Sequence, residues 1–288
     1  MRLRIAMQKS GRLAEKSLDL VGNAGLRVVK GANELLYRVE NAPIDILRVR
    51  DDDIPTFVAD GVADLGIVGL NVLAERGESG ADPIELMQLG FGKCDLRIAT
   101  PIGFDYRGPQ SLQGLRIATS YPRSLSRFLR ENDVRAEIVT MHGAVEVAPR
   151  LKLAQVICDL VSTGATLEAN GLVAVDTVLK SEAVLVQAPK QLSEELAHVV
   201  DSIVQRFRGV TASQGAKYVM MNAPRAALPR ITEILPGVDA PTVTPLAGRD
   251  DHVAVHAVCQ ESVFWETLER LKAAGASGIL VLPIEKMM

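Results

Sequence analysis

The segment whose residues indicate a chemical role most clearly runs from Val156 to Leu167. In it an apolar stretch leads into Ser-Thr-Gly-Ala-Thr and then into a predicted helix. Small residues let the backbone approach a bound group closely, and the free N–H groups at a helix start bind anions. The hydroxyls of Ser162, Thr163 and Thr166 add donors without bulk. The segment therefore predicts a cradle for a terminal phosphate. The alternative is an ordinary strand-to-helix turn with Thr166 as N-cap, because the lysine pattern of a P-loop is missing.

Two acidic residues accompany this segment. Asp159 lies at the carboxyl end of the predicted strand, the edge at which α/β sheets bind ligands, so its carboxylate could bond sugar hydroxyls or hold a hydrated divalent metal. An N-cap or turn role is the alternative. Glu146 lies in Val-Glu-Val, which reads as a strand with Glu146 opposite its apolar neighbours. Glu146 would then either face the sugar or be exposed.

Lys9, Gly11 and Arg12 directly follow the first predicted strand. Two cations separated by a glycine suit a polyphosphate or a diphosphate, because each cation can reach phosphate oxygens. A solvated surface turn is the alternative. Arg48 and Arg50 alternate with apolar residues on another strand and share a face. They could bind phosphate, or they could form ion pairs with the three adjacent aspartates that follow.

Those aspartates, Asp51, Asp52 and Asp53, are most simply explained as a helix N-terminus, where negative charge is favourable. Asp64 precedes an apolar strand that contains Gly66, and a glycine there would let a flat base approach the backbone. Close packing between the strand and a helix explains Gly66 equally well.

The elements that position these residues alternate along the chain, which predicts an α/β protein with largely parallel sheets. The predicted strands are 3–7, 44–50, 64–69, 96–100, 115–119 and 156–161, and the predicted helices are 13–23, 54–59, 122–131 and 166–170. The pattern occurs twice, which predicts two α/β lobes.

The last part of the chain has a different order, strand–helix–strand–strand–helix–strand. The predicted strands are 218–222, 242–246, 253–259 and 279–283, and the predicted helices are 225–235 and 262–274. This βαββαβ order is typical of the ferredoxin-like fold. We therefore expect a separate small C-terminal domain.

Composition limits the classes of function. The chain has 288 residues, 48% of them apolar, and a net charge of −3. This charge balance argues against a nucleic-acid binder, which would carry a basic excess. Three widely separated cysteines give neither a disulfide framework nor a zinc site. No apolar run approaches the roughly 20 residues of a membrane span, so no membrane partner and a cytoplasmic location are expected.

Several segments, taken together and in order, resemble the ATP phosphoribosyltransferase family. They are Arg4-Ile-Ala-Met-Gln-Lys-Ser-Gly-Arg-Leu13, Asp45-Ile-Leu-Arg-Val-Arg-Asp-Asp-Asp-Ile-Pro55, Asp64-Leu-Gly-Ile-Val-Gly69, Arg116-Ile-Ala-Thr-Ser-Tyr-Pro122, Val145-Glu-Val-Ala-Pro149, Asp159-Leu-Val-Ser-Thr-Gly-Ala-Thr-Leu167 and Ile279-Leu-Val-Leu-Pro-Ile-Glu-Lys-Met287. The extra βαββαβ segment makes the chain similar to the long form of the family.

The resemblance implies two lobes like those of periplasmic binding proteins, with a cleft between them, plus the C-terminal ferredoxin-like domain. The implied boundaries are 1–98 with about 175–212 for lobe I, 99–174 for lobe II and 213–288 for a regulatory domain that binds histidine. The implied reaction, the first step of histidine biosynthesis, transfers phosphoribosyl from 5-phosphoribosyl 1-diphosphate (PRPP) to N1 of the adenine of ATP. Diphosphate is released, Mg²⁺ assists, histidine inhibits, and the enzyme forms a homo-oligomer between dimer and hexamer.

The resemblance also implies two sets of binding residues. The PRPP set is Asp159, Ser162, Thr163, Gly164, Ala165 and Thr166, and the ATP and diphosphate set is Lys9, Gly11, Arg12, Arg50, Asp64 and Gly66. Asp159 is the candidate metal ligand. Other phosphoribosyltransferases usually carry two adjacent acids at this point, whereas Cys158 precedes Asp159 here. This departure implies that diphosphate carries much of the Mg²⁺. No residue is predicted as a general acid or base.

Two other functions fit parts of this pattern. One is a non-catalytic solute-binding or effector-binding module with the same two-lobed fold, which the phosphate cradle and the lack of a signal peptide disfavour. The other is a phosphoribosyltransferase that acts on a different base. An absorbance change near 290 nm with ATP, PRPP and Mg²⁺, which the resemblance implies for the product, would distinguish the predicted reaction from both.

Overall fold

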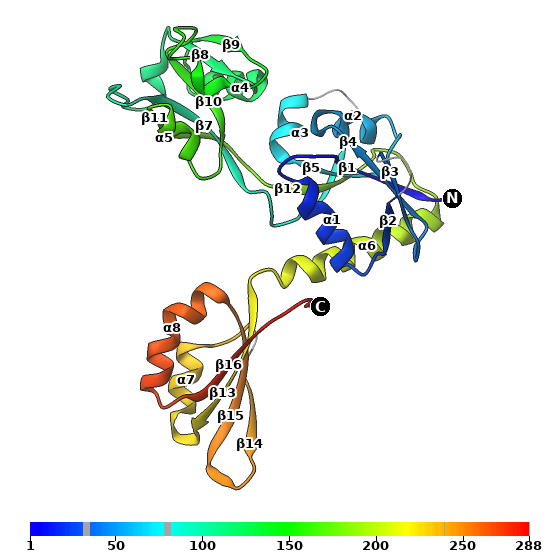
Figure 1. Cartoon of the computed structure of the whole chain (residues 1–288), viewed down its shortest axis with the longest axis vertical. Helices are drawn as coiled ribbons and strands as arrows, with labels where there is room; N and C mark the ends of the chain where they lie inside the picture. The colour runs from blue at the N-terminus through cyan, green and yellow to red at the C-terminus, as the bar shows by residue number, and fades with distance from the viewer. Residues whose placement is uncertain (31–34, 78–81, 239, 288) are drawn as a thin grey trace. The chain divides into compact units, whose positions relative to one another are not determined.

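The computed structural model describes residues 1–30, 35–77, 82–238 and 240–287. The chain divides into two compact units, Met1–Val204 and Gln205–Met288, and each is described by itself. The first unit contains two separate sheets, which define the two lobes, and the second unit contains one (Figure 1).

Lobe I is built on a seven-stranded sheet with the order β2-β3-β4-β1-β5-β12-β6. Its strands are β1 (Leu3–Gln8), β2 (Val28–Lys30), β3 (Leu36–Val39), β4 (Ile44–Val49), β5 (Leu65–Gly69), β6 (Ile84–Gln88) and β12 (Ala183–Gln187). Its helices are α1 (Ala14–Asn23), α2 (Ile54–Ala59) and α3 (Leu70–Arg76). Strands β4, β1 and β5 are parallel, so the loops that follow them meet at one edge of the sheet.

Lobe II is built on a five-stranded sheet with the order β11-β7-β10-β8-β9. Its strands are β7 (Cys94–Pro101), β8 (Arg116–Thr119), β9 (Glu137–Thr140), β10 (Val156–Val161) and β11 (Leu172–Ser181). Helix α4 (Pro122–Glu131) packs on one face, while α5 (Ala165–Ala169) and the 3₁₀ segment η3 (Val145–Val147) pack on the other. The chain thus passes to the second sheet before Cys94 and returns after Ser181, and the predicted lobe boundaries at 98 and 175 fall inside β7 and β11.

Hydrogen bonds join the two lobes of the first unit. The Glu75 carboxylate of α3 accepts from the backbone N–H groups of Arg123 and Ser124 at 2.8 and 3.0 Å, and from the Ser124 hydroxyl at 2.9 Å. Glu75 therefore satisfies free donors at the start of α4, a helix of the other lobe.

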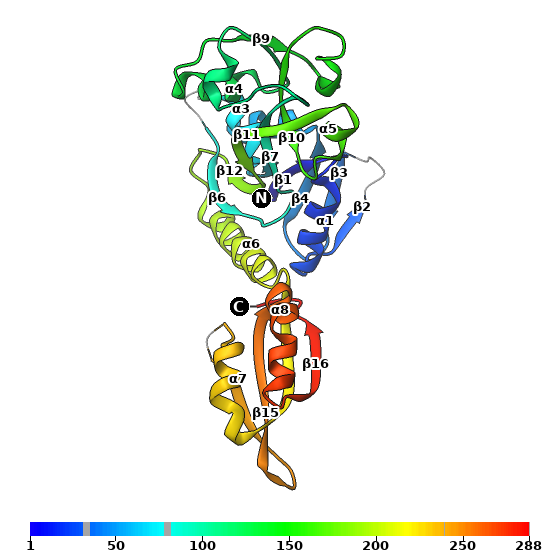
Figure 2. The same cartoon turned by 90° about the vertical axis from the view of Figure 1, so that its left-hand side faces the viewer.

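The second unit begins within α6 (Glu194–Ala212) and has the predicted βαββαβ order. Its elements are β13 (Ala216–Pro224), η4 (Arg225–Ala227), α7 (Leu228–Ile234), β14 (Thr242–Leu246), β15 (Arg249–Gln260), α8 (Glu261–Ala273) and β16 (Ser277–Pro283). The sheet is antiparallel with the order β14-β15-β13-β16, and α7 and α8 cover one face (Figure 1, and turned by 90° in Figure 2). The predicted ferredoxin-like order is confirmed.

Sequence patterns miss several elements of the first unit. The short edge strands β2, β3, β6 and β9 carry too few residues for a clear alternation, and β11, β12, α3 and α6 are also absent from the predicted elements. The Val-Glu-Val segment, predicted as a strand, is the 3₁₀ segment η3. This prediction is wrong because Ala144 adopts a left-handed conformation, with φ of 50°, and turns the chain before η3.

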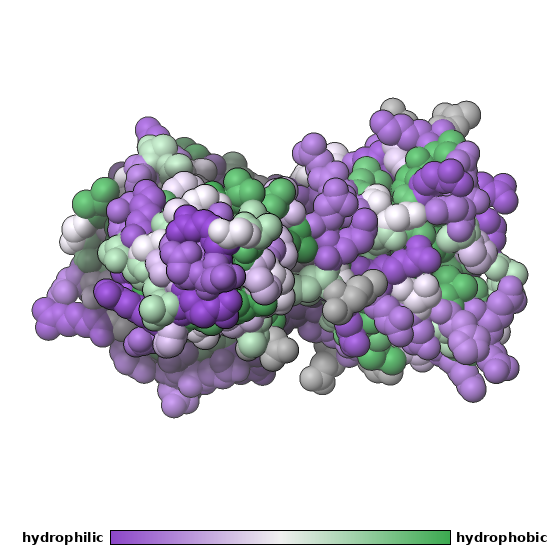
Figure 3. All heavy atoms as spheres, turned by 90° about the horizontal axis from the view of Figure 1, so that it is seen from below, coloured by the Kyte–Doolittle hydropathy of each residue, from purple (hydrophilic) through white to green (hydrophobic). Residues whose placement is uncertain are grey.

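The remaining properties concern the cysteines, the helices and the surface. Cys94, Cys158 and Cys259 are buried free thiols, which agrees with the expected lack of disulfides. Among the residues described, no helix is both long and apolar enough to span a membrane. The face seen in Figure 3 is mostly hydrophilic, with apolar residues in smaller groups.

Candidate functional site

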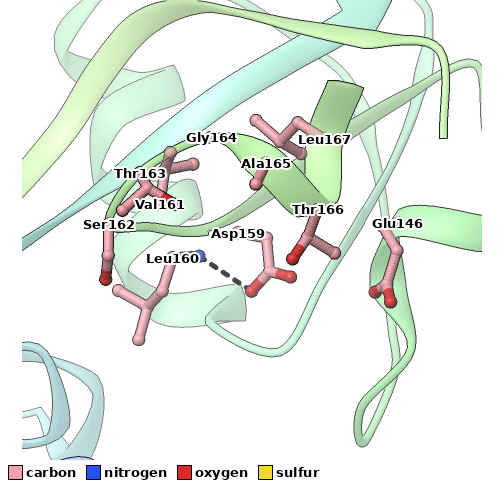
Figure 4. Close-up of a pocket in the computed structure, with 10 residues that line it drawn as sticks. All are labelled: Glu146, Asp159, Leu160, Val161, Ser162, Thr163, Gly164, Ala165, Thr166 and Leu167. Carbon is pink, nitrogen blue, oxygen red and sulfur yellow. Dashed lines mark hydrogen bonds between the residues drawn. The ribbon is translucent and has the colours of Figure 1, made fainter. Parts of the chain in front are cut away.

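A pocket of about 270 Å³ lies on lobe II at the carboxyl end of β10 (Figure 4). It is lined by Glu146, Asp159, Leu160, Val161, Ser162, Thr163, Gly164, Ala165, Thr166 and Leu167. All six residues predicted to bind PRPP therefore line one pocket. We call the segment from Asp159 to Leu167 the phosphate loop.

Alternation along β10 explains why Asp159 faces this pocket. Val156 and Cys158 are buried in the core beneath α4, whereas Ile157 is buried in the core beneath η3 and α5. Because successive side chains of a strand point to opposite faces, Asp159 shares the face of Ile157. Figure 4 shows its carboxylate and the Thr166 hydroxyl close together in the pocket.

Glu146 reaches the same pocket from η3, which contacts β10. The turns after η3 separate Glu146 from Asp159 in the sequence, so no local pattern indicates that the two carboxylates line one pocket. The 3₁₀ geometry that replaces the expected strand is what places Glu146 on the pocket wall.

The backbone of the phosphate loop is open where a ligand could approach. Gly164 has φ of 84° and precedes α5, and a Cβ added to Gly164 would meet no atom within 4 Å. Only a glycine adopts this left-handed conformation readily. Gly164 is the N-cap of α5 and Thr166 lies inside the helix, so the alternative in which Thr166 caps the helix does not hold.

The electrostatics of the pocket depend on its two acids. Burial raises the pKa of Asp159, the backbone N–H of Leu160 lowers it through a 2.8 Å hydrogen bond, and the charge of Glu146 raises it. The ten lining residues include no lysine or arginine. The pocket thus presents hydroxyl and backbone N–H donors together with two mutually repelling carboxylate acceptors, a combination that suits a phosphorylated sugar.

This arrangement suits a divalent cation that is bound partly by the protein and partly by the substrate. The described residues contain no group of three or more His, Cys, Asp or Glu side chains able to hold a metal ion by themselves. Mg²⁺ commonly takes one or two carboxylates together with substrate phosphates. Asp159 and Glu146 match that requirement, because a cation between them would relieve their repulsion.

On lobe I, the residues after β1 form a loop closed by its own contacts. The side-chain oxygen of Gln8 accepts from the backbone N–H of Leu13 at 2.8 Å. Gly11 has φ of 112°, and a Cβ there would lie 2.7 Å from Nε2 of Gln8. Because the Gln8 amide is already bound, it cannot move aside easily. We call Gln8 to Arg12 the cationic loop.

Arg12 and Arg50 differ in their surroundings. The guanidinium of Arg12 donates to the carbonyl of Gly92. The pKa of Asp51 is raised, first by burial and then by the charge of Asp52, and the charge of Arg12 opposes this shift. Arg50 is exposed at the end of β4. In the part of the chain that the structure covers, neither Arg48 nor Arg50 forms an ion pair with the three aspartates, so that alternative does not hold.

Asp64 lies apart from the cationic loop. It precedes β5, whereas Lys9 follows β1, and because these strands are parallel the two residues lie at opposite ends of the pair. The buried Asp64 carboxylate accepts from the backbone N–H of Arg4 at 2.8 Å and pairs with Lys190 at 2.9 Å. These contacts give Asp64 a structural role away from the other predicted ATP residues.

Gly66 is a packing residue. A Cβ at this position would lie 2.7 Å from Val58, 3.0 Å from Ile54 and 3.2 Å from Val186. The close approach of α2 and β12 therefore requires glycine, which was the alternative explanation for Gly66. The predicted ATP and diphosphate set divides into two groups. The carboxyl edge of the sheet carries Lys9, Gly11, Arg12 and Arg50, whereas Asp64 precedes β5 and Gly66 lies within it.

The fold and the site define a class. The class is a two-lobed α/β protein whose second lobe carries a candidate ligand pocket at the carboxyl end of a strand. Comparison with known proteins makes this specific. The profile of "ATP phosphoribosyltransferase" matches residues 50–209, and that of "HisG, C-terminal domain" matches residues 213–286.

Individual relatives agree. An ATP phosphoribosyltransferase of Maricaulis maris is 52% identical over 290 residues, covering 100% of this chain and 99% of the relative. The ATP phosphoribosyl transferase (HisG:HisZ) complex from Thermotoga maritima matches with a TM-score of 0.60 and 27% identity, covering 72% of this chain and 98% of that one. An extracellular-binding protein of Bacillus subtilis, ytmK, matches with a TM-score of 0.48 and 9% identity, covering 72% and 91%.

The chain therefore belongs to the ATP phosphoribosyltransferase family of histidine biosynthesis, and it is an enzyme. The predicted family, the long form with its C-terminal domain, and the two-lobed α/β fold are confirmed.

Proposed function

We propose that the phosphate loop binds the ribose 5-phosphate part of PRPP and that the enzyme transfers this group to N1 of the adenine of ATP. The observation that carries the proposal is the single pocket lined by Asp159, Gly164, Thr166 and their neighbours. Its N–H groups and hydroxyls suit the terminal phosphate. Its carboxylates suit the ribose hydroxyls, since a carboxylate only accepts hydrogen bonds.

In the proposed reaction, the lone pair of adenine N1 forms a bond to C1′ of the ribose. The bond from C1′ to the diphosphate oxygen breaks, and its electron pair leaves with diphosphate. Because N1 is itself a nucleophile, the protein supplies no attacking group. Its work is to align two anionic substrates and to stabilise the leaving diphosphate.

The cations of lobe I suit that second task. Lys9, Arg12 and Arg50 follow β1 and β4 at one edge of the sheet. We assign them to the phosphates of ATP and to diphosphate, with Gly11 shaping the loop. We assign no ligand contact to Asp64 or Gly66, whose packing and ion pair already account for them.

Mg²⁺ would be held by Asp159 and Glu146 together with substrate oxygens. The charge neutralisation that Mg²⁺ supplies when bound helps diphosphate to leave. The two carboxylates also orient the ribose through its hydroxyls, so their role does not depend on direct metal contact.

Thr166→Val tests the assignment of the phosphate loop. Valine keeps the shape of threonine but removes its hydroxyl donor, and a hydrogen bond to a charged group contributes roughly 1.5 to 3 kcal/mol. PRPP should therefore bind about ten- to a hundredfold more weakly in calorimetric titrations. Thr140→Val, on exposed β9 of the same lobe, is the control and should bind PRPP normally. Equal affinity in both variants would contradict the assignment.

We further propose that the second unit, from about residue 213, binds histidine and inhibits the enzyme noncompetitively with PRPP. The matching C-terminal domain supports this proposal. A separate site can slow catalysis only if histidine prefers a less active conformation, a coupling of roughly 1 to 3 kcal/mol.

Deletion of residues 217–288 should leave PRPP binding to the first unit intact and abolish inhibition by histidine. Assays of soluble protein with and without histidine measure this. Inhibition that survives the deletion would place the effector site in the first unit. If the deletion removes activity, the test uses substitutions on α8 or β14 in the full-length chain instead of the deletion.

We also propose a homo-oligomer in the cytoplasm, paired through the second unit. The sheet face opposite α7 and α8 carries Tyr218, Leu280 and Leu282, which are 38%, 53% and 49% exposed. Such apolar side chains on an uncovered sheet favour association. Sedimentation of the wild type and of Leu282→Lys tests this, and a variant that sediments like the wild type would contradict it.

A further inference from the structure

Arg48 is bound on both sides by groups of its own lobe rather than by an acid. One guanidinium nitrogen, Nη2, donates to the carbonyl of Lys9, and the other, Nη1, donates to the hydroxyl of Tyr37 at 2.5 Å. The guanidinium carbon also lies 4.9 Å from the centre of the Tyr37 ring. Tyr37 is itself buried at 5% exposure, so it provides a fixed support.

These contacts fix the peptide of Lys9 from both ends. The backbone N–H of Lys9 donates to the carbonyl of Val49 at 2.7 Å, and its carbonyl accepts from Arg48. Both partners belong to β4 or its end, which pairs in parallel with β1 up to Gln8 and Val49. The backbone at Lys9 is therefore held in a fixed orientation at the point where the loop leaves the sheet.

We propose that Arg48 is a positioning residue for the cationic loop, setting the direction in which Lys9 and Arg12 present their charges to the phosphates of ATP. The proposal rests on the proposed function of that loop. Arg48 donates from its two terminal nitrogens to Tyr37 and Lys9 at once. A lysine carries its donors on one nitrogen atom and lacks the planar fork that reaches both groups.

The test uses the full-length enzyme with Arg48→Met, Arg48→Lys and Tyr37→Phe. Misplacing a binding group by about an ångström costs up to about a hundredfold. We expect the KM for ATP to rise on the order of tenfold in both Arg48 variants and less in Tyr37→Phe. The KM for PRPP, whose proposed site is on lobe II, should not change, although a general loss of folding would affect both substrates.

Two outcomes would overturn the proposal. A normal KM for ATP in Arg48→Lys would show that charge alone suffices, and equal increases in both KM values would show a merely structural role. Arg38→Met is the matched control, because Arg38 is an exposed arginine on β3 next to Tyr37. Lys9→Met separates this proposal from the proposed function. If Lys9→Met raises the KM for ATP and Arg48→Met does not, only the role of Arg48 is lost. If neither does, the assignment of the cationic loop fails.

Discussion

The phosphate loop of lobe II and the cationic loop of lobe I both follow a strand and both contain a glycine with positive φ, yet they are built in opposite ways. At Gly11 an added Cβ would meet the bound Gln8 amide at 2.7 Å, whereas at Gly164 it would meet nothing within 4 Å. The cationic loop is closed on itself and presents side chains. The phosphate loop is open and presents its backbone.

The two loops also differ in charge. The pocket of the phosphate loop contains two acids and no cation, while the cationic loop carries Lys9 and Arg12. A glycine in a ligand loop can thus serve either internal packing or ligand approach, and only its neighbours distinguish the two. The comparison predicts that substitutions in the phosphate loop weaken PRPP binding beyond any effect that they have on stability.

Asp159→Asn should give the largest effect, a fall in turnover of roughly ten- to a hundredfold, since bonds to charged groups contribute about 1.5 to 3 kcal/mol. Stability should not fall. The raised pKa of Asp159 means that the folded state holds its proton more tightly than the unfolded state. Its contribution to stability is therefore greatest at low pH and decreases as pH rises through the raised pKa.

At neutral pH the ionised Asp159 is unfavourable for folding, and asparagine removes that charge while its side-chain oxygen can still accept from Leu160. Assays and thermal unfolding at pH 7 check this prediction. A marked drop in Tm, with normal turnover per folded molecule, would make Asp159 a structural residue.

Gly164→Ala should give the next largest effect, with Gly171→Ala as its matched control. Both glycines have positive φ, 84° and 69°, and open space at Cβ. Each alanine should therefore lower the free energy of unfolding by about 1 to 2 kcal/mol, because a residue with a Cβ is strained in the left-handed conformation. Only Gly164 lines the pocket, so only its variant should bind PRPP more weakly, by about tenfold for one lost hydrogen bond. Thermal unfolding and calorimetric titration measure the two effects. If both variants bind PRPP alike, backbone approach at Gly164 is not needed.

Glu146→Gln should give the smallest effect, a shift along the pH axis. An ionised Asp159 accepts from ribose hydroxyls more strongly than the neutral acid does, and the charge of Glu146 raises the pKa of Asp159. Removing that charge lowers the pKa of Asp159, so the acid limb of kcat/KM for PRPP should move to lower pH. Glu137→Gln, which changes an acid on β9 paired with Arg116, should leave the limb in place. A limb that moves to higher pH would contradict the proximity of the two acids.

Local sequence determined much of this protein. The strand, the loop and the helix from Val156 to Ala169 are contiguous, and so are the strands and helices of the βαββαβ unit. Backbone preferences and short-range hydrogen bonds act over a few residues, so periodicity and small residues suffice to locate them. The six residues of the phosphate loop that are predicted to bind PRPP line one pocket for the same reason.

Tertiary structure alone decided the roles that depend on distant partners. Glu146 lines the same pocket as Asp159 because η3 packs beside β10, and Asp64 pairs with Lys190, which is far away in the sequence. Arg48 holds Lys9 because β4 lies beside β1, and Tyr37 supports it from the neighbouring strand. Such roles follow from the order in which strands pair. Local patterns do not encode that order, because the energy that selects it comes from packing between segments far apart in the chain.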